Sequence, residues 1–446
     1  MKKLPLVGSF FFLSSVLAFV FYAITDWYFH DLARLFQIML ALLSVFFLQR
    51  LRSEPSIGLW LISLCMLVLS VRSGRWGVIE TLHILLLVFC VSAWSARLRQ
   101  VPEPNLGYFL LLPAAAYLAL ILLPRWAALT FQGLSFELAA FFFGFENPRF
   151  FGHWVTLTLP LMVYLASKTA GPQMRHSLCW WVFIAFWVAF LIASGTRGSW
   201  LALVVVTALL PFTGSGGRRL GWGMIQAGLS GILAYLLLFV LLPWVAQGDV
   251  TAPGAERIPE LAQLSKREVL WGLALDGIRS NVLFGRGPMT FSTVPNPVGA
   301  HPHNLFLQVA YEWGCIGAVA LAVFMLRCGL HQLMKCRAEA GMERVTVMAC
   351  IVAGVLQAQV DGVLVMPFSQ TLFAFLCAWL ISLDPAKESV ESGYWSRLRM
   401  SVCAIFLLIM STPEIRDLRA WEQNALASSG VNLYFPRFWA QGFVSY

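Results

Sequence analysis

Long apolar runs separated by short polar or basic segments restrict the possible folds of this chain more than any other feature. Such runs recur from Leu4 to about residue 411, and a helix needs ~20 apolar residues to cross a bilayer. The chain has 446 residues, of which 59% are hydrophobic and 12% charged, and its mean hydropathy is +0.74. This pattern excludes a soluble enzyme with one anchor. We therefore expect an all-α polytopic membrane protein, with residues 1–446 forming a single integral membrane domain.

The apolar runs predict a bundle of about 12 to 13 transmembrane helices. The predicted spans are 4–24, 33–49, 57–71, 77–94, 106–124, 152–167, 178–194, 199–213, 222–243, 304–327, 345–360, 363–383 and 399–411. No small-residue cleavage site follows the first run, so we expect a retained helix and not a signal peptide. Asp361-Gly362 and Pro367 interrupt the stretch 345–383, which predicts two spans joined by a tight polar turn.

The charged residues and cysteines exclude two further classes of protein. The net charge is +9, but the basic residues stand singly or in pairs at the ends of apolar runs, so they do not indicate nucleic-acid binding. The nine cysteines form no CxxC pair and lie in apolar runs or their short flanks. They predict neither a disulfide framework nor a metal site.

The Lys and Arg residues predict the orientation of the chain. With the N-terminus in the cytoplasm, the cytoplasmic flanks carry far more Lys and Arg than the short opposite flanks, as the positive-inside rule requires. The loop 244–301 and the C-terminal tail 412–446 are then expected on the outer, periplasmic side of the membrane. ATP is absent there, so a transferase on this side needs a pre-activated donor that is carried by a lipid.

The stretch 300–319, which reads AHPHNLFLQVAYEWGCIGAV, holds the main candidate residues. Asn304 is a good helix N-cap before an apolar run, and His303 stands at the mouth of the predicted membrane helix. Glu312 lies farther into the same span, where an ionisable group is costly and is a functional candidate. The alternative is that His303 only anchors the end of a helix at the membrane interface.

Two other connections on the predicted outer side carry unusual residues. The segment FGFENPRFFGHW sets Arg149 and His153 among aromatic residues and suggests a re-entrant or interfacial loop, although aromatic belts occur in any membrane protein. The turn SGTRGSW sets Arg197 among small residues. Its guanidinium can contact a phosphate or carboxylate in a bidentate manner, or it can be an ordinary interface anchor.

The loop 244–301 is expected to form a lid on the periplasmic side. Leu264, Trp271, Leu275 and Ile278 recur at helical spacing and predict an amphipathic helix. Arg267 falls one turn before Trp271 on the apolar side of this helix. A positive charge on that side is unfavourable unless an anion binds to it. The following turn, FGRGPMTF, contains Arg286 and is by itself a weak phosphate-binding signal.

The motifs SGTRGSW, SKREVLW with FGRGPMTF, and HPHNLFLQVAYEWGCIGA occur in an order that resembles the bacterial O-antigen ligase superfamily. The resemblance covers residues 140–380 and is densest over 190–325. It implies an undecaprenyl-pyrophosphate glycan as donor and no metal or cofactor. It also implies that Arg197, Arg267 and His303 are the catalytic residues.

In the reaction implied by this resemblance, Arg197 and Arg267 stabilise the leaving diphosphate. Neutral His303 takes a proton from the acceptor hydroxyl, and direct attack inverts the anomeric carbon. Further residues are expected to bind or orient the substrates: Arg149, His153, Arg286, Asn304, Glu312 and Asp361.

The expected acceptor is a protein Ser or Thr, such as that of a pilin, because the turn DGVLVMPFSQ resembles the pilin-glycosylating type and the outer rim is aromatic and sparsely basic. A lipid A-core O-antigen ligase and an O-antigen polymerase remain alternatives. A transporter of lipid-linked glycans is a more distant one, since it would predict internal repeats and charges in both halves of the membrane. The expected partners are the lipid-linked donor, the acceptor and the bilayer, without nucleic acid.

Overall fold

The structure of the chain is a computed structural model. It describes residues 29–47, 57–99, 103–133, 136–145, 147–168, 174–250, 252–255, 266–339, 341–385, 398, 401–409, 412 and 437–439. The predicted first span 4–24 lies outside these residues, and so does most of the predicted tail 412–446. Within the described residues the regular elements are all helices, without a strand. The predicted all-α class is confirmed.

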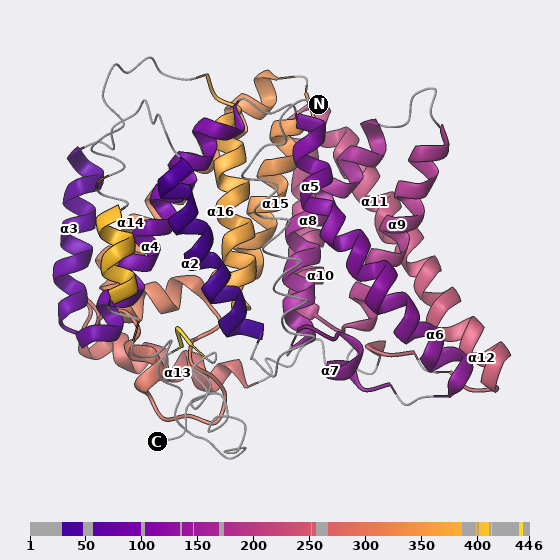
Figure 1. Ribbon diagram of the computed structural model, residues 1–446, viewed down its shortest axis with the longest axis horizontal. Coiled ribbons are helices and arrows are strands. Elements are labelled where there is room, and N and C mark those ends of the chain that lie inside the picture. Colours follow the sequence, from indigo (N-terminus) through magenta and orange to yellow (C-terminus); the bar gives the residue numbers. More distant parts are fainter. Residues whose placement is uncertain are drawn as a thin grey trace. The chain divides into compact units, whose positions relative to one another are not determined.

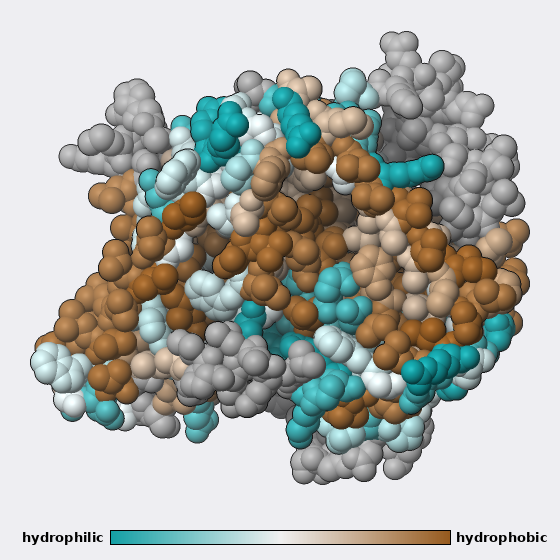
Figure 2. Space-filling view, turned by 180° about the vertical axis from the view of Figure 1, so that it is seen from behind, coloured by the Kyte–Doolittle hydropathy of each residue, from teal (hydrophilic) through white to brown (hydrophobic). Residues whose placement is uncertain are grey.

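Five described helical segments are long and apolar enough to cross a membrane. They are Gly74–Leu98, Leu110–Gln132, Pro148–Lys168, Ser215–Gln247 and Leu305–Ala338. Shorter apolar helices cover Leu178–Ala193, Arg197–Thr213 and Pro367–Ser382. Apolar side chains cover much of the face drawn in Figure 2. Large apolar residues that are exposed include Val204 and Leu233. This is the surface of a multi-pass membrane protein.

The described residues belong to two compact units. Unit 1 takes its residues from Val101–Gln263 and Gly329–Gln357. Its helical elements are α5 (Glu103–Tyr117), η1 (Leu118–Leu122), α6 (Leu123–Gln132), α7 (Leu138–Phe141), α8 (Pro148–Lys168), α9 (Met174–Ala193), α10 (Arg197–Leu209), η2 (Leu210–Thr213), α11 (Ser215–Tyr235), η3 (Leu236–Leu241), α12 (Leu242–Gln247) and α15 (Glu343–Gln357). Helix α8 packs against α9 and α15, and α9 packs against α11 (Figure 1).

Two helices of unit 1 contain a π-helical segment directly before a proline. The segments η1 and η3 end two residues before Pro124 and Pro243, respectively. Proline lacks an N–H and clashes with the carbonyl four residues earlier, so a local wide turn relieves the helix. The carbonyl of Phe239, which Pro243 cannot bond, accepts a hydrogen bond from the backbone N–H of Ala252 at 3.1 Å. The π-helical segment η3 thus leaves a carbonyl free to accept a hydrogen bond from the loop after α12.

The segment FENPRFFGHW does not form the predicted interfacial loop. Helix α8 begins at Pro148, where proline is well suited to the first helical position, and the Asn147 side chain accepts from the backbone N–H of Arg149 at 3.0 Å. Phe151 and Trp154 pack with Tyr117 at ring distances of 6.1 and 5.8 Å. The aromatic residues of this segment therefore fill the core of unit 1, and most of them are not at an exposed rim.

Unit 2 takes its residues from Val20–Gln100, Leu264–Cys328 and Ala358–Tyr446. Its helical elements are α2 (Phe29–Phe47), α3 (Ile57–Val71), α4 (Gly74–Leu98), α13 (Arg267–Ser280), η5 (Thr290–Thr293), the first part of α14 (Leu305–Ala338) and α16 (Pro367–Ser382), and residues 401–409 are also helical. Helix α4 packs against α2, α3 and α16 (Figure 1). Because α15 ends at Gln357 and α16 begins at Pro367, the prediction of two helices joined by a turn is confirmed.

Helix α14 is broken at Gly314, so the predicted continuous span 304–327 is wrong in this detail. Gly314 has φ +76° and ψ 174°, and a Cβ there would lie 2.0 Å from the carbonyl oxygen of Leu283. Residues 281–287 fill the break: the N–H groups of Arg286 and Gly287 donate to the carbonyls of Tyr311 and Glu312 at 2.8 and 2.9 Å. The backbone groups freed by the break are satisfied by protein, as a membrane interior demands.

Candidate active site

Arg197 begins helix α10 directly after a tight turn of small residues in unit 1. Gly195 has φ +61°, a conformation that favours glycine, and the hydroxyl oxygens of Ser194 and Thr196 lie 2.9 Å apart. Ser194 and Thr196 are buried, whereas Arg197 is half-buried. The turn fixes the start of α10 and leaves part of the Arg197 side chain accessible at a helix N-terminus, an end that favours anions.

Helix α8 meets this turn at Gly152. A Cβ at Gly152 would come within 2.6 Å of Oγ of Ser199 and 2.7 Å of Oγ1 of Thr196, so a side chain here would displace these hydroxyls. Gly152 lies between two predicted site residues, Arg149 and His153. The fold of unit 1 thus places the predicted residues of α8 on a helix that contacts the turn before Arg197. His153 is fully buried, while Arg149 is partly exposed.

Residues 252–255 of the predicted loop 244–301 cover the same turn. Gly254 has φ +82°, and a Cβ there would lie 2.4 Å from the carbonyl oxygen of Ile192. The hydroxyl of Tyr235 donates to the carbonyl of Pro253 at 2.9 Å. On the other side, Nε2 of Gln357 donates to Oγ of Ser199 at 2.8 Å. The turn before Arg197 is therefore held by contacts from several segments of unit 1.

His303, in unit 2, has a backbone conformation that side chains rarely adopt. Its φ is +52°, and its backbone N–H donates to Nδ1 of His301 at 3.2 Å. The two imidazole rings have their centroids 4.1 Å apart. Unusual backbone conformations of this kind cluster at functional sites because the surroundings must hold them in place.

The turn after α15 brings Asp361 to His303. Oδ1 of Asp361 lies 3.6 Å from Nδ1 of His303, and both side chains are largely buried, at 4% and 16% exposure. The same oxygen accepts from the backbone N–H of Gly362 at 2.8 Å. A Cβ on Gly362 would lie 2.8 Å from Cε1 of His301, so a larger residue there would displace the His301 ring. A carboxylate beside Nδ1 favours an imidazole whose Nε2 can accept a proton.

Asn304 acts as the predicted N-cap of α14. Its Oδ1 accepts from the backbone N–H of Leu307 at 2.9 Å, and its Nδ2 donates to the carbonyl of Gln359 at 3.1 Å. The backbone N–H of Leu305 donates to the carbonyl of Ala358 at 2.9 Å. The predicted cap is confirmed, and it also ties the start of α14 to the turn that carries Asp361.

Arg267 is the first residue of α13, which begins later than the predicted helix, and residues 256–265 lie outside the described residues. Trp271 donates through Nε1 to the carbonyl of Pro302 at 3.0 Å, so α13 is attached to the histidine segment. The buried face of α13 differs from the predicted one: Leu270 and Ala274 are fully buried, whereas Leu275 is 45% exposed. The buried face packs on Phe291 and Tyr311.

Arg286 lies in the segment that fills the break in α14. Its side chain is exposed, donates through Nη2 to Oγ of Ser280 at 2.9 Å, and stands 5.7 Å from the centre of the Tyr311 ring. Gly285 has φ +67°, and a Cβ there would lie 2.5 Å from the backbone N of Gly314. Gly285 therefore allows close backbone packing at the break, and the Arg286 side chain that follows it is exposed.

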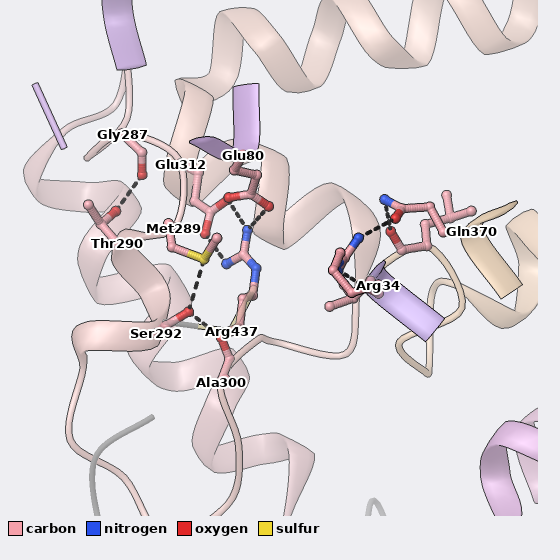
Figure 3. Close-up of polar contacts among 12 residues, drawn as sticks. Arg34, Glu80, Gly287, Met289, Thr290, Ser292, Ala300, Glu312, Gln370 and Arg437 are labelled. Atoms are coloured by element: carbon pink, nitrogen blue, oxygen red, sulfur yellow. Dashed lines mark hydrogen bonds and ion pairs between the residues drawn. The ribbon is translucent and has the colours of Figure 1, made fainter. Parts of the chain in front are cut away.

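Glu312 is buried and forms an ion pair with Arg437. Both guanidinium nitrogens Nη1 and Nη2 contact the Glu312 carboxylate, the second at 2.8 Å, and Nη2 also contacts Glu80 (Figure 3). Burial by itself would lower the pKa of Arg437, but the two carboxylates outweigh burial and raise it. The pairing satisfies Glu312 inside the protein, so its position in an apolar run reflects a buried ion pair.

The sequence patterns do not predict a set of polar residues in unit 2 that are buried or partly buried. They are Arg34, Gln37, Glu80, His83, Gln370 and Arg437. A signal was present, because Arg34, Glu80 and His83 are ionisable residues next to or within predicted spans, where such residues are functional candidates. Their partners lie far apart along the chain, so the signal could not reveal the pairing.

The predicted site residues thus fall into two groups, each within one unit. In unit 1, Arg149, His153 and Arg197 stand on elements that meet at Gly152. In unit 2, His303, Asn304 and Asp361 form one packed group, while Arg286 and Glu312 lie at the break in α14.

A comparison with protein families gives a match to part of the chain. The family model described as O-Antigen ligase matches residues 181–322, a range that contains Arg197, Arg267, Arg286, His303, Asn304 and Glu312. No curated protein and no solved structure matches the chain. The membrane-spanning helices agree with a membrane glycosyltransferase of the ligase and polymerase type. Residues 181–322 are thus similar to the O-antigen ligase family, and this match supports the resemblance found in the sequence motifs.

Proposed function

We propose that the protein transfers an oligosaccharide from undecaprenyl pyrophosphate to an acceptor hydroxyl on the periplasmic face of the bacterial inner membrane. The observation that carries the proposal is the contact between His303 and Asp361, because it gives the histidine of the matched family segment a partner that can orient it. The family match and the apolar helices support a membrane glycosyltransferase. The excess of Lys and Arg in one set of flanks supports the periplasmic orientation.

In this proposal neutral His303 is the general base. It takes the proton of the acceptor hydroxyl as the oxygen attacks the anomeric carbon, and the bond between that carbon and the diphosphate oxygen breaks. Asp361 keeps the imidazole in the required orientation and stabilises its protonated form. The attack is direct, so the anomeric configuration inverts and undecaprenyl diphosphate leaves. The proposed reaction needs no metal ion.

Arg197 and Arg267 are proposed to bind the diphosphate and to stabilise the charge that develops as it leaves. Arg197 stands at a helix N-terminus after a turn of small residues, and Arg267 at the start of α13. Both positions favour anions. A guanidinium can donate two parallel hydrogen bonds to a phosphate. Arg149, His153 and Arg286 are proposed to assist binding from their own elements.

For the acceptor we propose a protein Ser or Thr, as in a pilin. The support is the resemblance of the turn 361–370 to the pilin-glycosylating type, because this turn also carries Asp361 at His303. The aromatic residues of FENPRFFGHW no longer support this acceptor, since Phe145, Phe151 and Trp154 are buried. Lipid A-core and a growing O-antigen chain are the other acceptors that the assay must include.

The test is transfer by the purified protein in detergent, with a lipid-linked glycan and each acceptor offered separately. We expect a glycan mass shift on pilin that is lost in His303→Ala. Transfer in detergent, where no membrane gradient exists, removes the transporter alternative. Glycan found only on lipid A-core would contradict the proposed acceptor and keep the reaction, whereas no transfer to any acceptor would contradict the reaction itself.

A further inference from the structure

Residues Arg437, Phe438 and Trp439 are inserted into the interior of unit 2. Their exposed fractions are 2%, 2% and 0%, although the sequence predicts that they lie in a periplasmic C-terminal tail. Burying a charged residue requires compensation by partners. We call these three residues the 437–439 clamp. Their contacts indicate what compensates for the burial of Arg437.

The first contact of the clamp reaches the helix that follows His303. The guanidinium of Arg437 binds both carboxylate oxygens of Glu312 and one oxygen of Glu80 on α4 (Figure 3). Glu312 lies on residues 305–313, the part of α14 before the break at Gly314. This short helix begins at the Asn304 cap, directly after His303. The ion pair thus fixes its far end to α4.

The second contact reaches the turn that carries Asp361. The carbonyl of Phe438 accepts from Nε of Arg34 at 3.4 Å, and the Arg34 guanidinium stands 4.6 Å from the centre of the Phe438 ring. Arg34 also donates to the carbonyl of Val365 at 3.3 Å and to Oε1 of Gln370 at 2.9 Å (Figure 3). Arg34 therefore connects the clamp to residues 361–370.

The clamp thus contacts both the helix that follows His303 and, through Arg34, the turn that carries Asp361. Arg437 holds the helix of His303 through Glu312, and Phe438 holds the turn of Asp361 through Arg34. We propose that the 437–439 clamp is a positioning element that sets the separation of His303 and Asp361, with Arg437 as its positioning residue. The inference rests on the proposed function only in taking His303 as the general base.

The ion pair suggests a chemical-rescue test. Arg437→Ala leaves a space of guanidinium size between Glu80 and Glu312, and free guanidinium ion at millimolar concentration fits that charge and shape. We expect Arg437→Ala to lower kcat by about tenfold or more while KM for the lipid-linked donor changes little, because misplacement of a catalytic group slows chemistry. Guanidinium chloride should restore the rate, and sodium chloride at equal ionic strength should not. The proposal is overturned if kcat is unchanged. It is also overturned if the folded variant has a lower kcat that guanidinium fails to restore.

A second variant separates positioning from simple stability. Arg437→Ala removes the ion-pair partner of buried Glu312 and partly buried Glu80, which can prevent folding. Glu80→Gln, Glu312→Gln and Arg437→Met are therefore combined to remove all three charges together. Positioning predicts a folded triple variant with a low kcat. A folded triple variant with the rate of the unmodified protein shows a purely structural ion pair and overturns the proposal.

Hydrogen exchange tests the clamp independently of activity. Arg437→Ala should increase exchange in peptides that cover residues 300–313 and 358–366, and guanidinium should reverse the increase. If the unmodified protein transfers no glycan, the proposed function fails, and this experiment still decides the clamp. Unchanged exchange in both peptides contradicts it.

Discussion

Oδ1 of Asp361 lies 3.6 Å from Nδ1 of His303, and the turn that carries Asp361 also bonds to the N-cap next to that histidine. The two residues come from segments that are separated by the whole of α14 and α15. Their contact turns a histidine at a helix start into an oriented imidazole. The following predictions test this contact and the elements around it.

The first prediction concerns the histidine–aspartate contact. His303→Ala should lower kcat by about 10² to 10⁴, the usual contribution of a general base. Asp361→Asn keeps the shape but loses the charge that orients the imidazole, and should lower kcat by about tenfold to a hundredfold. The measurement is transfer of a lipid-linked glycan by purified protein.

A double-mutant cycle and a matched control make this prediction specific. Because Asp361 acts through His303, the variant with both changes should be no slower than His303→Ala alone. Asp276→Asn is the control, since Asp276 is 71% exposed and pairs with Arg279 on the surface of α13. Additive losses in the double variant would contradict the assignment of Asp361.

The second prediction concerns the arginines. Arg267→Ala and Arg197→Ala should each lower the rate by about a hundredfold, since one strong transition-state contact contributes ~3 kcal/mol. Lysine should restore activity only in part, because it keeps the charge and loses the bidentate geometry. Arg279→Ala, on the same helix as Arg267 and 78% exposed, is the matched control and should retain full activity. Full activity of both alanine variants in stably inserted protein would exclude the proposed roles.

The third prediction concerns the orientation of the chain. The nine cysteines are replaced first, and single cysteines are then introduced for Arg197, His303 or Arg337. A membrane-impermeant thiol reagent added to cells with a permeabilised outer membrane should label the first two positions and not the third, because the Lys and Arg bias places them on opposite sides. The reverse labelling pattern would place the proposed chemistry in the cytoplasm and contradict it.

Local patterns in the sequence were sufficient for much of the fold and part of the site. Apolar runs predict the spans because each helix must cover about the same membrane thickness. The Asn304 cap and the turn between α15 and α16 depend on neighbouring residues, and both are confirmed. The sequence predicts His303 and Asp361 separately as site residues, although no local pattern indicates that they meet.

Features that depend on distant residues could not be predicted in this way. Arg437 and Glu312 are 125 residues apart in the chain, and a lone glutamate in an apolar run does not identify its partner. The aromatic segment at residues 145–154 has the composition of an interfacial belt, but its rings are buried by contacts with α5 and α9. The break at Gly314 was missed for the same reason, since residues 281–287 supply the backbone partners.

The last prediction tests that break. Gly314 has φ +76°, and a Cβ there would overlap the Leu283 carbonyl oxygen at 2.0 Å. Gly314→Ala should therefore destabilise the protein by roughly 1–3 kcal/mol or more, the cost of strained backbone, with the overlap in addition. Gly329→Ala is the matched control, because Gly329 lies on the same helix and a Cβ there meets nothing within 4 Å. Thermal unfolding in detergent should show a lower Tm for Gly314→Ala and no loss for Gly329→Ala, where alanine favours the helix. If the two variants unfold at the same temperature, α14 is continuous through residue 314 and residues 281–287 do not pack into it.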